Sequence, residues 1–456
     1  MNQTFSVPSC RSDVSRPGRP RKPRAVARWV LAAMASWSLV PLEGLADEAR
    51  QSLRLESAEI QGIILREFER RDPEYLQERD TYAAKLAPLV ERLIALQEKG
   101  EDMACSEQIY IENRWLLEQT ANWPRLETRI DALERSMETM DQGFAREQSA
   151  QDGSWGPCYE EWFLKLDAAI TALNDLADRS EFPSYPLSFL DNISDPDVLR
   201  RYLDDLLISD VVRTGIDRRD ELGAVTGALS QLLFKEQLRR FVDEPAEGFS
   251  VDDEYIEAYR RFLDASQDLA TGYWGAWYRV GTKLYKSADL SLTFHTISYS
   301  KGDVRLWPQI IDTTLAIKSF EYPYGWLKNR SYNHHNNYDV LKIFRYGWPH
   351  MTARQKAQAR AELAAMLAWC LEPPMDPKAP FSVDATFYSS PGDYYYYGVS
   401  FFDEIGLWNP TERFWTSEDF PGALALCLSI KAQLLESRLD TPPARAALQK
   451  LERNCP

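Results

Sequence analysis

One short segment of the chain places imidazole, amide and phenol side chains in immediate succession: Asn333-His334-His335-Asn336-Asn337-Tyr338-Asp339. Imidazole and phenol groups can transfer protons, and amides can donate hydrogen bonds to an anion, so no metal is needed for such chemistry. A protein core would need a partner for each of these polar groups. We therefore predict catalytic residues here and in two flanking segments: His334, His335, Asn336, Asn337, Tyr338, Arg345 and Tyr394.

Aromatic residues gather beside glycine turns in the same half of the chain, at 272–278, 322–326 and 390–397. Such rings suit stacking on sugars, and Tyr and Trp add a polar group for hydrogen bonding. We expect the following residues to bind substrate: Trp274, Trp277, Arg279, His295 and Tyr396. Alternatively, these side chains have a structural role. Some of the rings must belong to the core, and a lone histidine is more often a structural residue than a functional one.

Charge is unevenly distributed along the chain. The 53 Lys and Arg against 69 Asp and Glu give a formal net charge of −16, which argues against a general nucleic-acid binder. Residues 275–350 nevertheless carry ten Lys and Arg and only five Asp and Glu, a local excess of +5. A basic segment in an acidic protein indicates a local anionic ligand. A solvated face without a partner is the alternative.

These signals together favour eliminative cleavage of a polymer that contains uronic acids. The reaction needs a group that neutralises the sugar carboxylate, a base for the adjacent C–H proton and an acid for the leaving oxygen. A glycoside hydrolase would instead need two carboxylates across a cleft. The acidic candidates for that alternative are Asp289, Asp339, Asp393, Asp403 and Glu404. We expect no cofactor, and the cysteine spacings match no zinc signature.

The elements that must position these residues are mainly helical. Apolar residues recur at helical spacing over 304–319, 338–347, 354–371, 421–437 and 443–453, and alternating strand patterns are scarce. Ser194-Asp195-Pro196 is a strong helix start, with a capping side chain followed by proline in the first turn. We predict a helical region over 47–185, which could dock a partner protein, and a second domain over 186–456.

A weak internal repeat suggests how the second domain is built. Residues 338–348 can be laid over 397–408, and a looser copy begins at 288. Units of this size are helical hairpins with one long loop, and several of them stack into an array. We therefore predict an all-α protein with an (α/α) toroid or incomplete toroid, preceded by the N-terminal helical hairpin or bundle.

The first 46 residues have the features of a secretory signal. Basic residues precede an apolar run from Trp29 to Leu42, which ends in Gly44-Leu45-Ala46. We expect export to the periplasm or outside the cell, without stable membrane insertion after cleavage. An exported chain can keep disulfides. We predict the pair Cys105 and Cys158, and leave open whether Cys455 pairs with Cys427.

The segments Asn333 to Tyr338 and Asp393 to Tyr397 resemble two parts of the (α/α)-toroid polysaccharide lyases, of the alginate-lyase and chondroitin-lyase type. The resemblance covers about residues 270 to 415. It implies that Asn336 or Asn337 neutralises the substrate carboxylate, that His334 or His335 is the base or a neutralising group, and that the acid is Tyr338 or Tyr394. The chain also resembles secreted bacterial proteins of the same helical type that have no assigned activity.

The predicted function is thus that of an exported carbohydrate-active enzyme, a lyase of an acidic polysaccharide. A glycoside hydrolase on the same scaffold and a non-catalytic periplasmic glycan-binding or assembly protein are the alternatives.

Overall fold

The computed structural model describes residues 60, 62–139, 141–243, 249–371, 391–439 and 441–455, and this part of the chain is mainly helical. The predicted signal sequence, residues 1–46, lies outside the described residues. None of the described helices is long and apolar enough to cross a membrane. The chain divides into two compact units, an N-terminal unit that ends at Arg305 and a C-terminal unit whose described part begins at Leu306.

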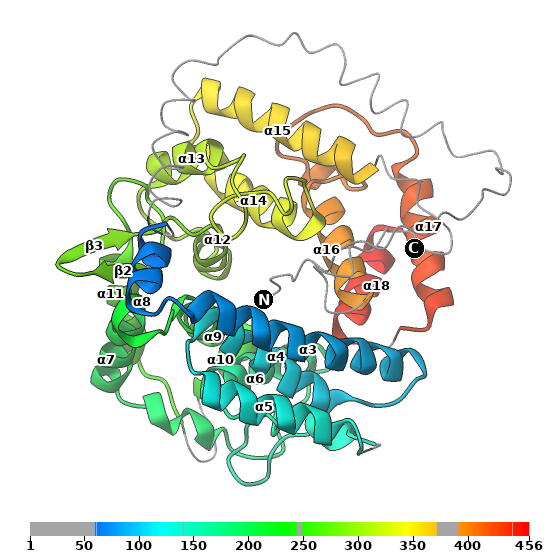
Figure 1. Ribbon diagram of the computed structural model, residues 1–456. Coiled ribbons are helices and arrows are strands. Elements are labelled where there is room, and N and C mark those ends of the chain that lie inside the picture. The colour runs from blue at the N-terminus through cyan, green and yellow to red at the C-terminus, as the bar shows by residue number, and fades with distance from the viewer. Residues whose placement is uncertain are drawn as a thin grey trace, which may run out of the picture. The chain divides into compact units, whose positions relative to one another are not determined.

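The N-terminal unit is built from helices and one small sheet (Figure 1). Its longer helices are α3 (Tyr75–Glu98), α4 (Ala104–Gln119), α5 (Trp123–Ser136), α6 (Trp162–Asp178), α7 (Pro196–Leu207), α9 (Arg219–Phe234), α10 (Glu236–Asp243), α11 (Asp253–Ser266) and α12 (Leu290–Tyr299). Its shorter elements are η1 (Gly143–Arg146), η2 (Ser188–Ile193), α8 (Val211–Thr214) and the strands β1 (Ile208–Ser209), β2 (Trp277–Val280) and β3 (Lys283–Lys286).

The strands form one sheet in the order β1-β2-β3, with β1 parallel to β2 and β2 antiparallel to β3. Two of the predicted substrate-binding residues, Trp277 and Arg279, therefore lie on a strand of a β-hairpin.

The predicted start of α7 is confirmed. The side chain of Asp195 accepts hydrogen bonds from the backbone N–H groups of Asp197 and Val198, and Pro196 is the first helical residue. Leu199 and Leu203 lie on the buried face of the helix. An acidic cap and an N-terminal proline satisfy the free donors of the first turn, which is why so local a pattern specifies the helix start.

The predicted boundary near residue 185 falls inside the N-terminal unit, where α6 packs against α9. The polar, proline-containing segment there is a loop that covers α10. The rings of Phe182 and Phe241 are in edge contact with centroids 5.5 Å apart, and Arg240 donates a hydrogen bond to the carbonyl of Glu181. Turn residues mark a surface loop as readily as a linker between domains.

The described part of the C-terminal unit is helical (Figure 1). Its elements are α13 (Trp307–Ala316), α14 (His334–Gly347), η3 (Trp348–His350), α15 (Ala353–Leu371), α16 (Pro391–Glu404), η4 (Pro410–Glu412), α17 (Ala423–Ser437) and α18 (Pro442–Asn454). Helix α14 packs against α13, α15 and α16, and α18 packs against α16 and α17. Two copies of the predicted repeat are helical, since 338–348 falls mainly on α14 and 397–408 mainly on α16.

Two disulfides cross-link the described chain. The predicted pair Cys105–Cys158 is confirmed, and Cys427 is bonded to Cys455, the pairing that the sequence left open. Cys370 is a buried free thiol.

Candidate active site at the start of helix α14

Helix α14 begins at His334, earlier than the predicted start at 338. Asn333 adopts an extended conformation and its Oδ1 atom accepts the backbone N–H of Asn336 at 2.8 Å, which caps the helix. The polar residues expected in a loop therefore form the first turn of a helix. Because Oδ1 is used by the cap, the Nδ2 donor of Asn333 is left over, buried and without a hydrogen-bond partner among the described residues.

The two adjacent histidines have different surroundings. His334 is 3% exposed, and its ring lies edge-on to the rings of Trp369 and Tyr394, with centroids 5.4 Å and 5.1 Å away. Burial lowers the pKa of His334 from 6.5 to about 3. These contacts are those of a neutral ring held in the core.

His335 is only half-buried and lies among phenol rings. Its ring meets that of Tyr397 edge-on with centroids 4.4 Å apart, and that of Tyr322 with centroids 5.4 Å apart. Burial lowers the pKa of His335 to about 4, and the hydrogen bond with Asn336 opposes this shift in part. The imidazole is therefore neutral at neutral pH and able to accept a proton.

The side chain of Asn336 fixes which nitrogen of His335 can accept that proton. It is fully buried, and its Nδ2 atom donates to the carbonyl oxygen of Trp326 at 2.9 Å. This bond turns Oδ1 toward His335, 3.2 Å from Nδ1. An amide oxygen only accepts, so Nδ1 must carry the hydrogen and Nε2 keeps the lone pair.

The ring of Tyr397 lies closer to the ring of His335 than that of Tyr322 does. Burial, followed by the nearby carboxylate of Asp393 and other acidic neighbours that include Asp339, raises the pKa of Tyr397 well above its ordinary value of 10. The hydroxyl of Tyr322 donates to Oδ2 of Asp339 at 3.4 Å. The phenol of Tyr397 thus stays protonated, so an acid and a base lie side by side.

Sequence reasoning did not select Tyr397 or Tyr322 as catalytic, although both lie in segments that it singled out. Helical spacing offered a signal. Tyr394 and Tyr397 are three residues apart on α16, so they lie on one face and meet successive residues of α14, His334 and His335.

Asn337 and Tyr338 of α14 and Tyr396 of α16 differ in burial. Asn337 is fully buried, and its Nδ2 donates to Sγ of Cys370 at 3.6 Å, while its Oδ1 has no partner among the described residues. Tyr338 is half-buried, with Nζ of Lys342 5.8 Å from its ring centroid. Tyr396 is also half-buried, and its ring centroid lies 5.2 Å from that of Tyr397.

Arg345 is held in ion pairs. Its Nε lies 3.3 Å from Oε2 of Glu404, and its Nη2 lies 2.9 Å from Oε2 of Glu412. Lys342 and Lys318 are paired in the same way with Glu404 and Glu362, at 2.6 Å and 2.5 Å. Much of the basic excess in residues 275–350 is thus neutralised by acidic residues that lie outside that segment.

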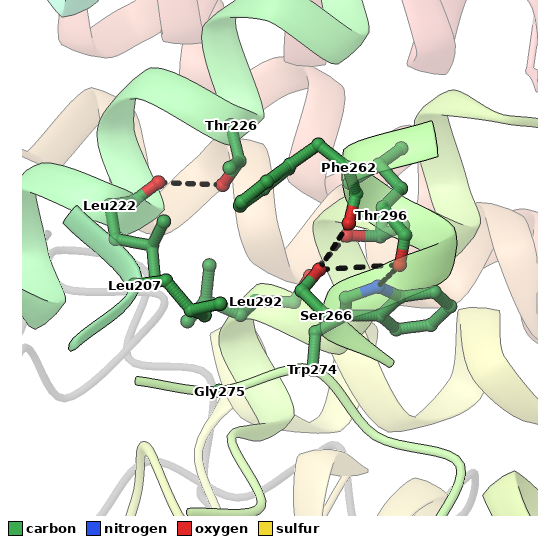
Figure 2. A pocket seen from close by; sticks show the side chains of 10 residues that line it. Leu207, Leu222, Thr226, Phe262, Ser266, Trp274, Gly275, Leu292 and Thr296 are labelled. Carbon is green, nitrogen blue, oxygen red and sulfur yellow. Dashed lines mark hydrogen bonds between the residues drawn. The ribbon is translucent and has the colours of Figure 1, made fainter. Parts of the chain in front are cut away.

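The other predicted substrate-binding residues belong to the N-terminal unit. Trp274 is buried, donates from Nε1 to the carbonyl of Leu263 at 2.7 Å and lines a cavity of about 10 Å³, room for about one water molecule (Figure 2). Trp277 is half-buried, with Nζ of Lys286 4.2 Å from its ring centroid, and Arg279 is exposed on β2. His295 is stacked on Tyr299, with ring centroids 5.6 Å apart.

Within the described residues, no group of three or more His, Cys, Asp or Glu is arranged to hold a metal ion. The chain has no match among protein-family models, curated proteins or solved structures. The site itself offers a neutral imidazole of fixed tautomer beside a protonated phenol.

Proposed function

We propose that the chain is an exported carbohydrate-active enzyme that cleaves a uronic-acid-containing polysaccharide by β-elimination. The observation that carries the proposal is the pair His335 and Tyr397, with ring centroids 4.4 Å apart. The reaction requires a neutral base for the C5 proton and a protonated acid for the leaving oxygen of the same sugar linkage, and two neighbouring side chains can serve one linkage. The acid is thus proposed to be Tyr397, whereas the sequence pointed to Tyr338 or Tyr394.

In the proposed reaction Nε2 of His335 removes the C5 proton of the uronic acid. The electron pair of that C–H bond forms the C4=C5 double bond, the C4–O bond breaks, and Tyr397 protonates the leaving oxygen. His335 is then an imidazolium and Tyr397 a phenolate, and a proton passed from the first to the second restores both. The Nδ2 donor of Asn333 and the positive end of the α14 dipole are proposed to neutralise the substrate carboxylate.

A second candidate function is glycoside hydrolysis. The carboxylates of Asp339 and Asp393 both act on Tyr397, which favours this reading. Three further acidic candidates make ion pairs with basic side chains. Asp289 is bonded to Arg219 at 2.7 Å, Glu404 to Lys342 at 2.6 Å, and Asp403 lies 3.8 Å from Nζ of Lys450. A hydrolase would use Asp339 and Asp393.

The architecture proposed for residues 186–456 remains an (α/α) toroid or incomplete toroid. Support comes from the C-terminal unit, where α14 packs against α16 and α16 packs against α18, with one described α-helix between the members of each pair in the chain. Export to the periplasm or outside the cell is supported by the two disulfides. The helices within residues 47–185 are proposed to form a docking surface for a partner protein.

The test is to incubate the protein with a panel of uronic-acid polymers and to follow the ultraviolet absorbance of the unsaturated ends that elimination forms. His335→Ala should lower the rate by at least about 100-fold. His350→Ala is the matched control, because His350 is stacked on Trp307 in the same unit, with ring centroids 5.3 Å apart. Reducing ends released from neutral glycans without unsaturated products would instead establish a hydrolase. Binding without turnover would establish a glycan-binding protein.

A further inference from the structure

The N-terminal unit contains a hollow of about 240 Å³ that shares no residue with the candidate active site. Its walls come from the end of α9, from α10, from α11 and from the end of α12 with the turn that follows. The lining includes the side chains of Phe234, Arg239, Ile256, Arg260, Tyr299 and Lys301.

Three elements each contribute a cation to this hollow, and none of its described lining residues is acidic. Nε of Arg239 bonds to Oδ1 of Asp243 at 2.7 Å, and Nη1 of Arg260 bonds to Oδ2 of Asp303 at 3.2 Å. A guanidinium has five N–H donors, so each of these arginines keeps donors for a ligand. Lys301 is exposed and makes no ion pair within the described part of the chain.

Aromatic rings contact one of these cations, Arg260, and a further cation beside the hollow, Lys235. The guanidinium of Arg260 lies over the ring of Phe234, 5.0 Å from its centroid. Nζ of Lys235 lies 4.8 Å from the ring centroid of Tyr299 and donates to Oε1 of Gln231 at 2.6 Å, which adds a fourth positive charge beside the hollow. Cation–π contacts of this kind orient a charged group before a ligand arrives.

We propose that this hollow binds one uronic acid residue of an acidic glycan. Arg260 and Lys301 bind the carboxylate, with Arg239 beside them, and the apolar face of the sugar ring lies against Phe234 and Ile256. The planar fork of an arginine matches a carboxylate. The inference takes its ligand class from the proposed function, but binding here needs no candidate catalytic residue.

The experiment is calorimetric titration of the His335→Ala protein, which cannot turn over its ligand by the proposed route, with an unsulfated oligogalacturonate. Arg260→Gln and Lys301→Gln are then introduced in that background. Each should weaken binding about 10- to 100-fold, since each removes a charge-assisted hydrogen bond. Arg305→Gln is the matched control, because Arg305 is an exposed arginine of the same unit that pairs with Asp264 at 3.1 Å but does not line the hollow.

A neutral oligosaccharide of the same length should not bind measurably, and a sulfated neutral oligosaccharide should bind more weakly than the uronate. The inference is overturned if Arg260→Gln and Lys301→Gln bind like their parent, if Arg305→Gln weakens binding as much, or if the neutral sugar binds equally well. If the wild type turns over polymers but these variants bind like their parent, the binding site in the hollow is refuted while the proposed elimination stands. Binding that depends on Arg260 without any turnover would refute the proposed elimination alone.

Discussion

The Oδ1 atom of Asn336 lies 3.2 Å from Nδ1 of His335, and the Nδ2 atom of the same amide donates to the carbonyl of Trp326 at 2.9 Å. One fully buried side chain thus links a backbone carbonyl to the proposed base. The hydrogen bond to the Trp326 carbonyl fixes the orientation of the Asn336 amide. The amide oxygen in turn requires a hydrogen on Nδ1 of His335, which fixes the tautomer of the imidazole. Asn336, which the sequence suggested as a neutralising group, is therefore better described as a positioning residue.

Asn336→Ala should lower kcat by at least about tenfold, because His335 loses the acceptor that holds its Nδ1 hydrogen. Asn336→Asp should move the acid limb of the pH profile of kcat/KM to higher pH, since a carboxylate beside Nδ1 stabilises the imidazolium. The measurement is the full pH profile of elimination. Asn337→Ala is the control, and an acid limb that moves equally in that variant would contradict the positioning role.

Tyr397→Phe should lower kcat about 100-fold or more and change KM little, because it removes only the proposed proton donor. Tyr394→Phe should stay within a few-fold of wild type. Tyr394 is 5% exposed, and its ring packs on His334 instead of His335. Steady-state kinetics of the two variants decides between them, and a greater loss in Tyr394→Phe would return the acid role to Tyr394.

Local patterns were sufficient for much of the fold. Asp195 and Pro196 mark the start of α7 because a cap and a proline act within one helical turn. The Asn333 cap works in the same local way, but the polar residues that follow it are typical of a loop, so the sequence predicts the start of α14 at 338 instead of His334. Packing against α13, α15 and α16 stabilises α14. A local sequence pattern does not reveal these contacts, because the residues that make them lie elsewhere in the sequence.

Long-range contacts account for what the sequence did not predict at the site. Arg345 carries the signature of an anion-binding residue, and its actual partners include Glu412, 67 residues further along the chain. Trp274 stands beside a glycine as a sugar-stacking residue would, yet its indole N–H donates to the carbonyl of Leu263 in the interior. A residue type reveals which interactions a side chain can make, while the fold decides which partner comes within reach.

The disulfide Cys105–Cys158 should stabilise the N-terminal unit, because it closes a loop across a sequence separation of 53 residues. Beside it, Arg129 donates to the carbonyl of Cys158 at 2.8 Å and to the buried carboxylate of Glu112 at 2.6 Å. Replacing both cysteines by serine should lower the free energy of unfolding by about 2–4 kcal/mol in urea titrations.

Thiol labelling checks the same pairing independently. When the chain from Asp47 onward is unfolded without reductant, an alkylating reagent should modify one cysteine, Cys370. Modification of Cys105 or Cys158 under these conditions would show that the pair is not formed.

The buried imidazole of His334 should make stability depend on pH. Its pKa is lowered from 6.5 to about 3 in the folded chain, so between these values the unfolded chain binds a proton that the folded chain does not. Stability from this group is therefore complete above pH 6.5 and is lost as the pH falls toward 3, by about 3 kcal/mol between pH 7.5 and 4.5. His334→Gln removes this contribution, so its destabilisation relative to wild type should shrink by that amount over the same range in urea titrations.

Phe402→Leu is the control, because it changes an apolar ring whose centroid lies 6.5 Å from that of His334, and its loss of stability should be the same at both pH values. Equal pH dependence in the two variants would mean that the titration of His334 is not what weakens the protein in acid.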